Sequence, residues 1–184
     1  MKVNKSLLEE QNRVQKEKSM VAEIRNSKIE LENLLTKRVN PEDLYTGLCK
    51  IGEGGAGQIF KATNIKTKEL FAIKKMNLFP ETANTMAQEI FIMKNCKHEN
   101  IVQYYESFKV DFVELWIVME YMEYGCLTDI LNQYEFGIQL EEYHMSYIIL
   151  EILSALRYIH SLDIIHRDIK SDNILVGHYH IKIS

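Results

Sequence analysis

The stretch that decides the fold is His166-Arg167-Asp168-Ile169-Lys170-Ser171-Asp172-Asn173. Asp168 can accept a proton from a hydroxyl group, Lys170 can reach a phosphate, and Asn173 offers the hard oxygen that Mg²⁺ prefers. The alternative is a charged loop in which Asp and Asn serve only as turn residues. The setting favours chemistry, because an amphipathic helix precedes the stretch and a short apolar strand, predicted over 174–176, follows it.

A second pattern is Gly52-Glu53-Gly54-Gly55-Ala56-Gly57, which fits G-x-G-x-x-G but is weak evidence alone. A dinucleotide-binding fold would continue into a helix, whereas residues 58–63 have the β-branched and aromatic content of a strand. A glycine-rich hairpin lets backbone N–H groups approach phosphates without obstruction by Cβ atoms. Gly52, Gly54 and Gly57 are therefore candidate phosphate-binding positions.

The run Phe71-Ala72-Ile73-Lys74 predicts a buried strand that ends in a lysine. Lys74 is the candidate for holding the α- and β-phosphates, and it needs a carboxylate to keep it in place. Glu89, in a helix predicted over 81–95, is the candidate partner, although a lone Lys–Glu pair is more often a solvated surface pair. Lys75 would point to the other face of the strand.

A further strand is predicted for Leu115-Trp116-Ile117-Val118-Met119-Glu120-Tyr121-Met122, which runs into a linker with Gly125. Together these motifs resemble the eukaryotic protein kinase domain, from about Tyr45 to Ser184. Within that family the resemblance is to the STE group of Ser/Thr kinases and its PAK-like branch. The segments that carry it, besides the first stretch, are 72–78, 118–121 and 127–129.

The resemblance implies an α+β, two-lobed fold. Residues 40–122 would form a complete β-rich N-lobe with the hinge, and residues 123–184 would begin the helical C-lobe. The implied activity is that of a protein serine/threonine kinase, which moves the γ-phosphate of ATP to Ser or Thr of a protein substrate with Mg²⁺ as cofactor. Residues 1–44 do not resemble the GTPase-binding segment that usually precedes this domain in the PAK-like branch.

Site roles follow from the resemblance, residue by residue. Asp168 is the expected base. The residues expected to handle phosphate and Mg²⁺ are Lys170, Lys74 with Glu89 as its partner, and Asn173 as the metal ligand. The Glu120 carbonyl and the Met122 N–H match the adenine contacts. The expected apolar wall of the adenine slot, each member of which alone would be ordinary core, comprises Ile51, Ile59, Ala72, Leu175 and, as gatekeeper, Met119. His166 is expected to pack and form hydrogen bonds, not to act as the base.

The last four residues indicate how much of the kinase domain this sequence contains. Ile181-Lys182-Ile183-Ser184 matches the strand directly before the D-F-G motif, so the domain is predicted to be truncated and Asn173 to be its one recognisable Mg²⁺ ligand. The alternative to an active kinase is a catalytically inactive fragment that acts as a nucleotide-binding or scaffolding module. The helix predicted over 141–160 is apolar on more than one face, which predicts self-association of the isolated chain.

Composition and charge narrow the kinds of partner and the cellular location to expect. The net charge of −4 gives no case for nucleic-acid binding, and the charged N-terminus predicts no signal peptide. The apolar run of the helix predicted over 141–160 is too short for a membrane span, so no membrane partner is expected. Three scattered cysteines are consistent with free thiols in the cytoplasm. Residues 1–39 form a charged helical or disordered segment, interpreted as a solvated helix or as a coiled-coil site for a regulatory partner. His178 and His180, predicted to alternate on a strand, are too few for a metal site.

Overall fold

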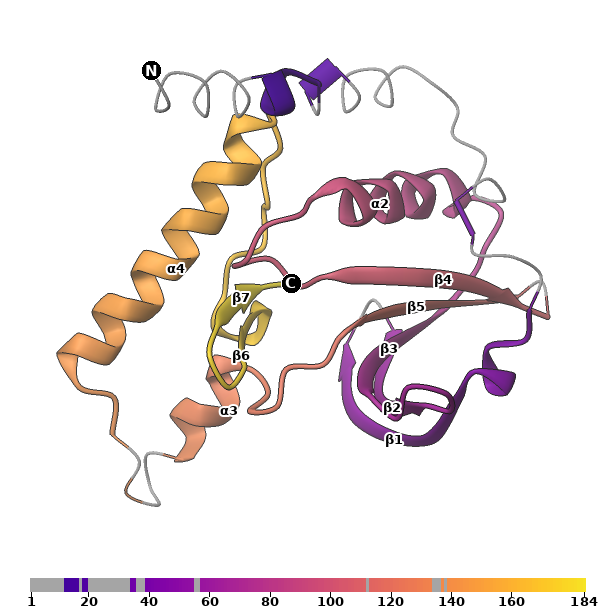
Figure 1. Cartoon of the computed structure of the whole chain (residues 1–184), viewed down its shortest axis with the longest axis horizontal. Helices are drawn as coiled ribbons and strands as arrows, with labels where there is room; N and C mark the ends of the chain where they lie inside the picture. Colours follow the sequence, from indigo (N-terminus) through magenta and orange to yellow (C-terminus); the bar gives the residue numbers. More distant parts are fainter. Residues whose placement is uncertain are drawn as a thin grey trace.

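The protein has two parts joined by a linker, as the computed structural model shows (Figure 1). The structure describes residues 12–16, 18–19, 34–35, 39–54, 57–111, 113–133, 137 and 139–184. One part is a five-stranded sheet with a helix, α2, over one face. The other contains two helices and a two-stranded sheet. The predicted α+β fold, with a β-rich lobe followed by a more helical one, is confirmed.

The large sheet is antiparallel throughout, with strand order β1-β2-β3-β5-β4. Its strands are β1 (Tyr45–Gly54), β2 (Gly57–Asn64), β3 (Leu70–Asn77), β4 (Tyr104–Val110) and β5 (Glu114–Glu120). Strands β3 and β5 are the most apolar and lie inside the sheet, where both of their faces are covered. Two separate apolar clusters form, one on each face of the sheet.

Helix α2 (Ala83–Asn95) covers one of these faces and contributes Ala87 and Ile90 to its core. The sequence predicted a helix from residue 81, and this start is wrong by two residues. The Thr82 N–H donates to the Phe79 carbonyl at 3.1 Å, so a tight turn occupies the backbone just before the helix.

The second part contains α3 (Leu127–Asn132), α4 (Glu142–Ser161), the 3₁₀ turn η4 (Ser171–Asn173), and the strands β6 (Ile174–Val176) and β7 (Ile181–Ile183). His178 and His180 do not alternate on a strand, because they lie in the turn between β6 and β7, closed by a Gly177 N–H bond to the His180 carbonyl. A single 3₁₀ turn, η2 (Pro41–Asp43), with Asn40 as its N-cap, precedes β1.

The N-terminal segment is described only in part. Residues 12–16 and 18–19 are helical, and Val14 packs against an apolar cluster that includes Cys96 and Ile159. The residues on which the solvated-helix and coiled-coil interpretations of 1–39 depend lie mostly outside the described residues. Within the part of the chain that the structure describes, no helix is long and apolar enough to cross a membrane.

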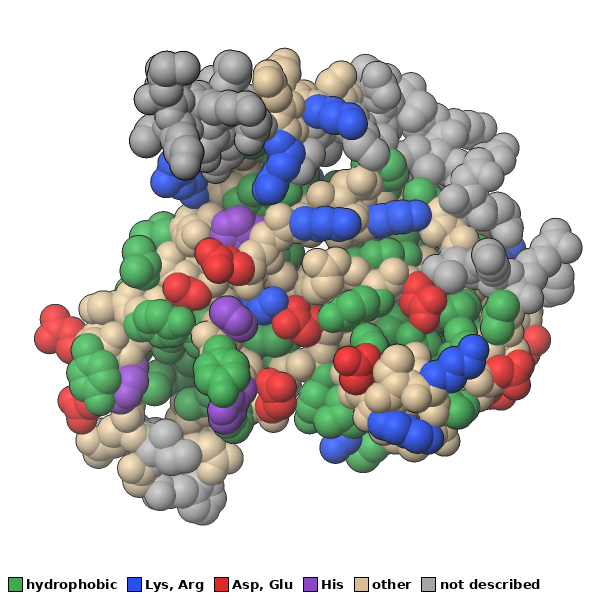
Figure 2. Space-filling model, in the orientation of Figure 1, with side chains coloured by type: hydrophobic (Ala, Val, Ile, Leu, Met, Phe, Trp, Pro, Cys, Tyr) green, Lys and Arg blue, Asp and Glu red, His purple; other side chains and the backbone are tan. Residues whose placement is uncertain are grey.

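Helix α4 is apolar on more than one face, as its sequence predicts. One face is buried through Ile148, Ala155, Tyr158 and Ile159. Other large side chains of the helix are exposed: Tyr143, Met145, Tyr147, Ile149, Leu150 and Leu153. Figure 2 shows hydrophobic side chains at the surface over α4, on the left of the view. An exposed group of large apolar side chains such as this favours association with another surface.

The exposed face of α4 predicts self-association of a polypeptide of these 184 residues. Replacing Leu150 and Leu153, which are 63% and 56% exposed, with lysine should shift the polypeptide toward monomer in sedimentation-velocity experiments. Val113→Lys is the matched control, because Val113 is 63% exposed but lies in the β4–β5 turn. A monomeric parent polypeptide would contradict the prediction.

Gly57, the first residue of β2, has φ +129°, and a Cβ there would lie 2.2 Å from the Lys75 carbonyl oxygen. Gly57→Ala should therefore lower the free energy of unfolding by about 1–3 kcal/mol, measured by urea denaturation. Gly54→Ala is the control, because no atom lies within 4 Å of a Cβ at that position. Equal unfolding midpoints for the two variants would show that Gly57 is not sterically required.

Candidate active site

The three polar side chains of the first stretch meet in the loop before β6. Lys170 Nζ lies 3.0 Å from Asp168 Oδ2, and Asn173 Nδ2 donates to Asp168 Oδ2 and to the Asp168 carbonyl, both at 2.8 Å. The hydrogen bond from Lys170, followed by that from Asn173, lowers the pKa of Asp168 below its usual value. The carboxylate is exposed and ionised, with its orientation set by two donors.

His166 holds this loop from the other side. Its Nδ1 accepts the Asp168 N–H at 3.3 Å, so Nε2 carries the proton of a neutral ring and donates to the Ser184 carbonyl at 3.0 Å. Arg167, between them, has φ +69°, an uncommon conformation for a residue with a side chain. Both nitrogens of His166 are thus used in backbone hydrogen bonds, which matches the role expected for it.

Two further contacts anchor the loop, and the sequence reasoning did not find them. Thr128 Oγ1 in α3 and Ser171 Oγ in η4 lie 2.8 Å apart. The Ser184 N–H, just after β7, donates to the Asn173 carbonyl at 3.0 Å. Both contacts join segments distant in sequence, so no local pattern signals them. They fix η4, and with it the position of Asn173.

Lys74 lies in the middle of β3, with Ile59 of β2 and Ile117 of β5 as its neighbours across the sheet. Its side chain is half-buried, whereas Glu89 of α2 is exposed. Among the residues that the structure describes, no ion pair joins Lys74 and Glu89. The buried residues Ala87 and Ile90 turn toward the sheet instead, so this conformation does not bring the two candidate partners together.

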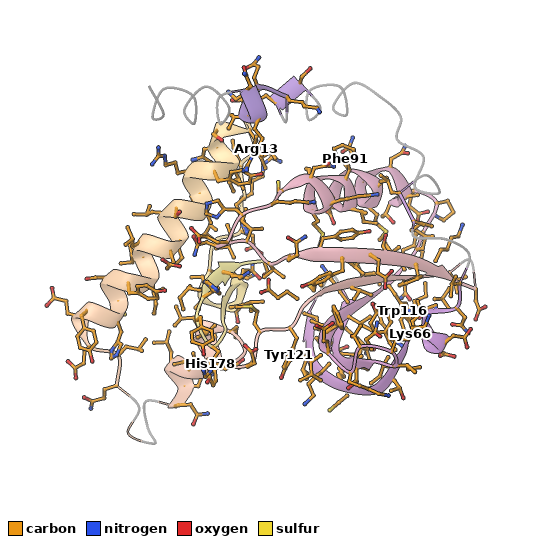
Figure 3. The ribbon with its side chains drawn as sticks, in the orientation of Figure 1. Arg13, Lys66, Phe91, Trp116, Tyr121 and His178 are labelled. Atoms are coloured by element: carbon orange, nitrogen blue, oxygen red, sulfur yellow. The ribbon has the colours of Figure 1, made fainter. Side chains whose placement is uncertain are left out.

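Lys75 points to the opposite face, as the strand period requires. Its Nζ lies 3.6 Å from the centre of the Trp116 ring and 5.0 Å from that of Phe60. Figure 3 labels Trp116 on the sheet. Burial between these rings lowers the pKa of Lys75, and the charge is stabilised by the ring faces. Lys75 is a packing residue, which leaves Lys74 as the lysine on the α2 side.

The glycine-rich stretch forms the turn between β1 and β2. Gly52 and Gly54 lie in β1, and Gly54 pairs with Gly57 at the start of β2. Gly55 and Ala56 lie outside the described residues. A Cβ at Gly52 would meet only ordinary contacts with Ile59, and one at Gly54 none. Packing within the chain therefore explains Gly57 but not the other two, and the space at Gly54 is open.

The expected adenine wall is brought together except for one member. Ala72 and Met119 are buried in the cluster beside α2, and Ile59 and Leu175 pack against it. Ala72 and Met119 are also direct neighbours across the β3–β5 pair. Ile51, in contrast, is 49% exposed and does not belong to this cluster.

The linker that follows β5 forms hydrogen bonds to β6. The Tyr124 N–H donates to the Val176 carbonyl at 3.0 Å, and the Val176 N–H donates to the Gly125 carbonyl at 2.9 Å. Met122, the expected adenine-contacting residue, is buried, and Glu120 ends β5. The linker, the apolar wall and Leu175 of β6 consequently surround one region, on the side of the sheet that also carries Lys74.

Comparison with known proteins identifies this arrangement. The protein kinase domain family matches residues 45–184. The chain is 51% identical over 138 residues to the serine/threonine-protein kinase pakA of Dictyostelium discoideum, covering 75% of this chain and 11% of that protein. It is 48% identical over 151 residues to pakC of the same organism, covering 82% and 31% respectively.

A fungal relative gives the same result. The serine/threonine-protein kinase ste20 of Emericella nidulans is 43% identical over 139 residues, which cover 75% of this chain and 16% of that protein. The chain thus spans less than a third of the length of these relatives. Because the family match covers most of its residues, the chain belongs to the protein kinase domain family, and within it to the serine/threonine, PAK-like type.

Proposed function

We propose that this chain forms the nucleotide-binding and catalytic-loop part of a cytoplasmic kinase that transfers the γ-phosphate of ATP to Ser or Thr of proteins. The observation that carries the proposal is the contact of Asp168 with Lys170 and Asn173 in one loop. Phosphoryl transfer needs mainly alignment and neutralisation of charge, and these three side chains supply both.

Asp168 would act on the protein substrate. Its ionised carboxylate accepts the proton of the Ser or Thr hydroxyl as the hydroxyl oxygen bonds to the γ-phosphorus and the bond from that phosphorus to the ADP oxygen breaks. Lys170, already 3.0 Å from Asp168 Oδ2, would face the transferred phosphate. The pair holds a base and a cation side by side, where a hydroxyl and a phosphate must meet.

ATP would occupy the region between the glycine-rich turn and the hinge. Its adenine would contact the Glu120 carbonyl and the Met122 N–H. The apolar side chains around the ring would be those of Ile51, Ile59, Ala72, Met119 and Leu175. Its phosphates would lie near Gly52, Gly54, Gly57 and Lys74. The open space at Gly54, where a Cβ would meet no atom within 4 Å, supports this placement. Support of Lys74 by Glu89 would require α2 to turn Glu89 toward the sheet, because Glu89 is exposed in this conformation.

Asn173 is the residue that would hold Mg²⁺. Its amide nitrogen is used in both bonds to Asp168, which leaves the amide oxygen for a hard cation. This donor fits Mg²⁺, which commonly binds few protein ligands and completes its shell with water and phosphate oxygens. When bound, the ion would neutralise phosphate charge.

Residues 1–39 remain the proposed contact for a regulatory partner.

The base role of Asp168 predicts that Asp168→Asn lowers kcat by about 10²–10⁴-fold, because the amide cannot accept the proton. The measurement is transfer of labelled γ-phosphate to Ser- and Thr-containing peptides by the full-length protein. Asp172→Asn is the matched control, since Asp172 is an exposed carboxylate of the same loop. If Asp168→Asn retains full activity, Asp168 is not the base; if the parent protein itself transfers no phosphate, the non-catalytic alternative, a nucleotide-binding or scaffolding module, replaces the kinase proposal.

The hydrogen bond from Lys170 predicts a pH effect on Asp168. Because Lys170 favours the charged form, Lys170→Met should raise the pKa of Asp168 toward its usual value, so the carboxyl protonates at a higher pH than in the parent. Carboxyl ¹³C titration by NMR measures this directly. Lys94→Met, at an exposed position in the last turn of α2, should leave the titration unchanged. A downward shift in Lys170→Met would contradict the assignment.

A further inference from the structure

An ion pair joins the two parts of the molecule beside the hinge. Lys182 Nζ of β7 lies 2.8 Å from Glu120 Oε2 at the end of β5. Lys182 is only 8% exposed, which is unusual for a lysine. Among the ion pairs formed by the described residues, this is the one that connects the five-stranded sheet to the two-stranded sheet.

The Glu120 carboxylate has a second partner. The same Oε2 atom accepts the Gln103 N–H at 3.1 Å, and the Glu120 N–H donates to the Gln103 carbonyl at 2.9 Å. Both the side chain and the backbone of Glu120 are therefore fixed by the segment that leads into β4. A buried ammonium without a counter-charge is strongly unfavourable, so Lys182 has little freedom to leave this position.

The other end of β7 connects to the catalytic loop. The Ile183 N–H donates to the Asn100 carbonyl at 2.9 Å, and the Val102 N–H donates to the Ile183 carbonyl at 3.0 Å. The next residue, Ser184, bonds through its N–H to the Asn173 carbonyl and through its own carbonyl to His166. From Lys182, two residues along the chain thus lead to the loop that orients Asp168.

We propose that Glu120 and Lys182 are a positioning pair that sets the hinge relative to the catalytic loop. The inference rests on the proposed function, in which the Glu120 carbonyl contacts adenine while Lys170, beside the base Asp168, faces the γ-phosphate. The adenine and the γ-phosphate belong to one molecule, so both ends of the site must be spaced correctly for ATP to bind at both. Neither residue touches the reacting atoms; each acts through the backbone that carries a contact.

A purely structural role predicts a different result. Removal of one partner from a buried ion pair is destabilising, because the other charge stays buried without a counter-charge. Neutralising one partner in a structural pair would lower the unfolding temperature and leave the ATP affinity of the folded protein unchanged. In a positioning pair, removal of either charge lets the end of β5 and β7 shift relative to each other, so ATP affinity falls in protein that is still folded.

The test is ATP affinity of the full-length protein, measured by isothermal titration calorimetry, together with the unfolding temperature. Lys182→Met and Glu120→Gln should each weaken ATP binding about tenfold. The double variant should be no weaker than either single variant, because the two changes remove one interaction. Lys182→Arg, which keeps the charge, should bind ATP as the parent does.

Lys66→Met is the matched control. Lys66 is exposed in the β2–β3 turn, and Figure 3 shows it well to the right of Tyr121, which follows β5. Its ATP affinity should equal that of the parent. Single-variant affinities within twofold of the parent, or effects that add in the double variant, would overturn the positioning role. Absence of phosphate transfer by a parent protein that binds ATP would instead count against the proposed function alone.

Discussion

The pairing of β3 with β5 is the constraint on which the site depends. It sets Ala72 against Met119 and Lys74 against Ile117, in the centre of the sheet. Because side chains alternate along a strand, a slip of one residue would move Lys74 to the face where Lys75 packs on Trp116. The apolar cores on both faces hold this register, so the position of a charged residue is determined by its uncharged neighbours.

The features predicted correctly from the sequence are those with a local pattern. Continuous apolar runs located β3 and β5. Asp168, Lys170 and Asn173, which are close in sequence within 166–173, also lie together in the structure. The ends of elements were harder, as at the start of α2, because backbone hydrogen bonds in a turn decide them. The turn at His178 and His180 was missed since a short hairpin and a continuing strand have similar composition.

Contacts between residues far apart in the sequence could not be predicted, for a different reason. The exposure of Glu89 depends on how α2 rotates over the sheet, and helical spacing does not determine that rotation. Lys182 gave no signal either, because a lysine between two isoleucines is typical of an ordinary half-exposed strand. Its burial against Glu120 requires residues separated by 62 positions to come together. Packing of one part of the molecule on the other creates such contacts, and no window of sequence contains them.

The two bonds from the Asn173 amide to Asp168 have a consequence for the chemical lifetime of the protein. Hydrolysis of this amide, a slow spontaneous reaction of asparagine, would create a carboxylate where Nδ2 now donates at 2.8 Å from Asp168 Oδ2. Two like charges at that distance disfavour each other's ionisation and would push the side chains apart. Replacement of one nitrogen atom by oxygen would therefore make the contact between residue 173 and Asp168, which now orients the loop, repulsive.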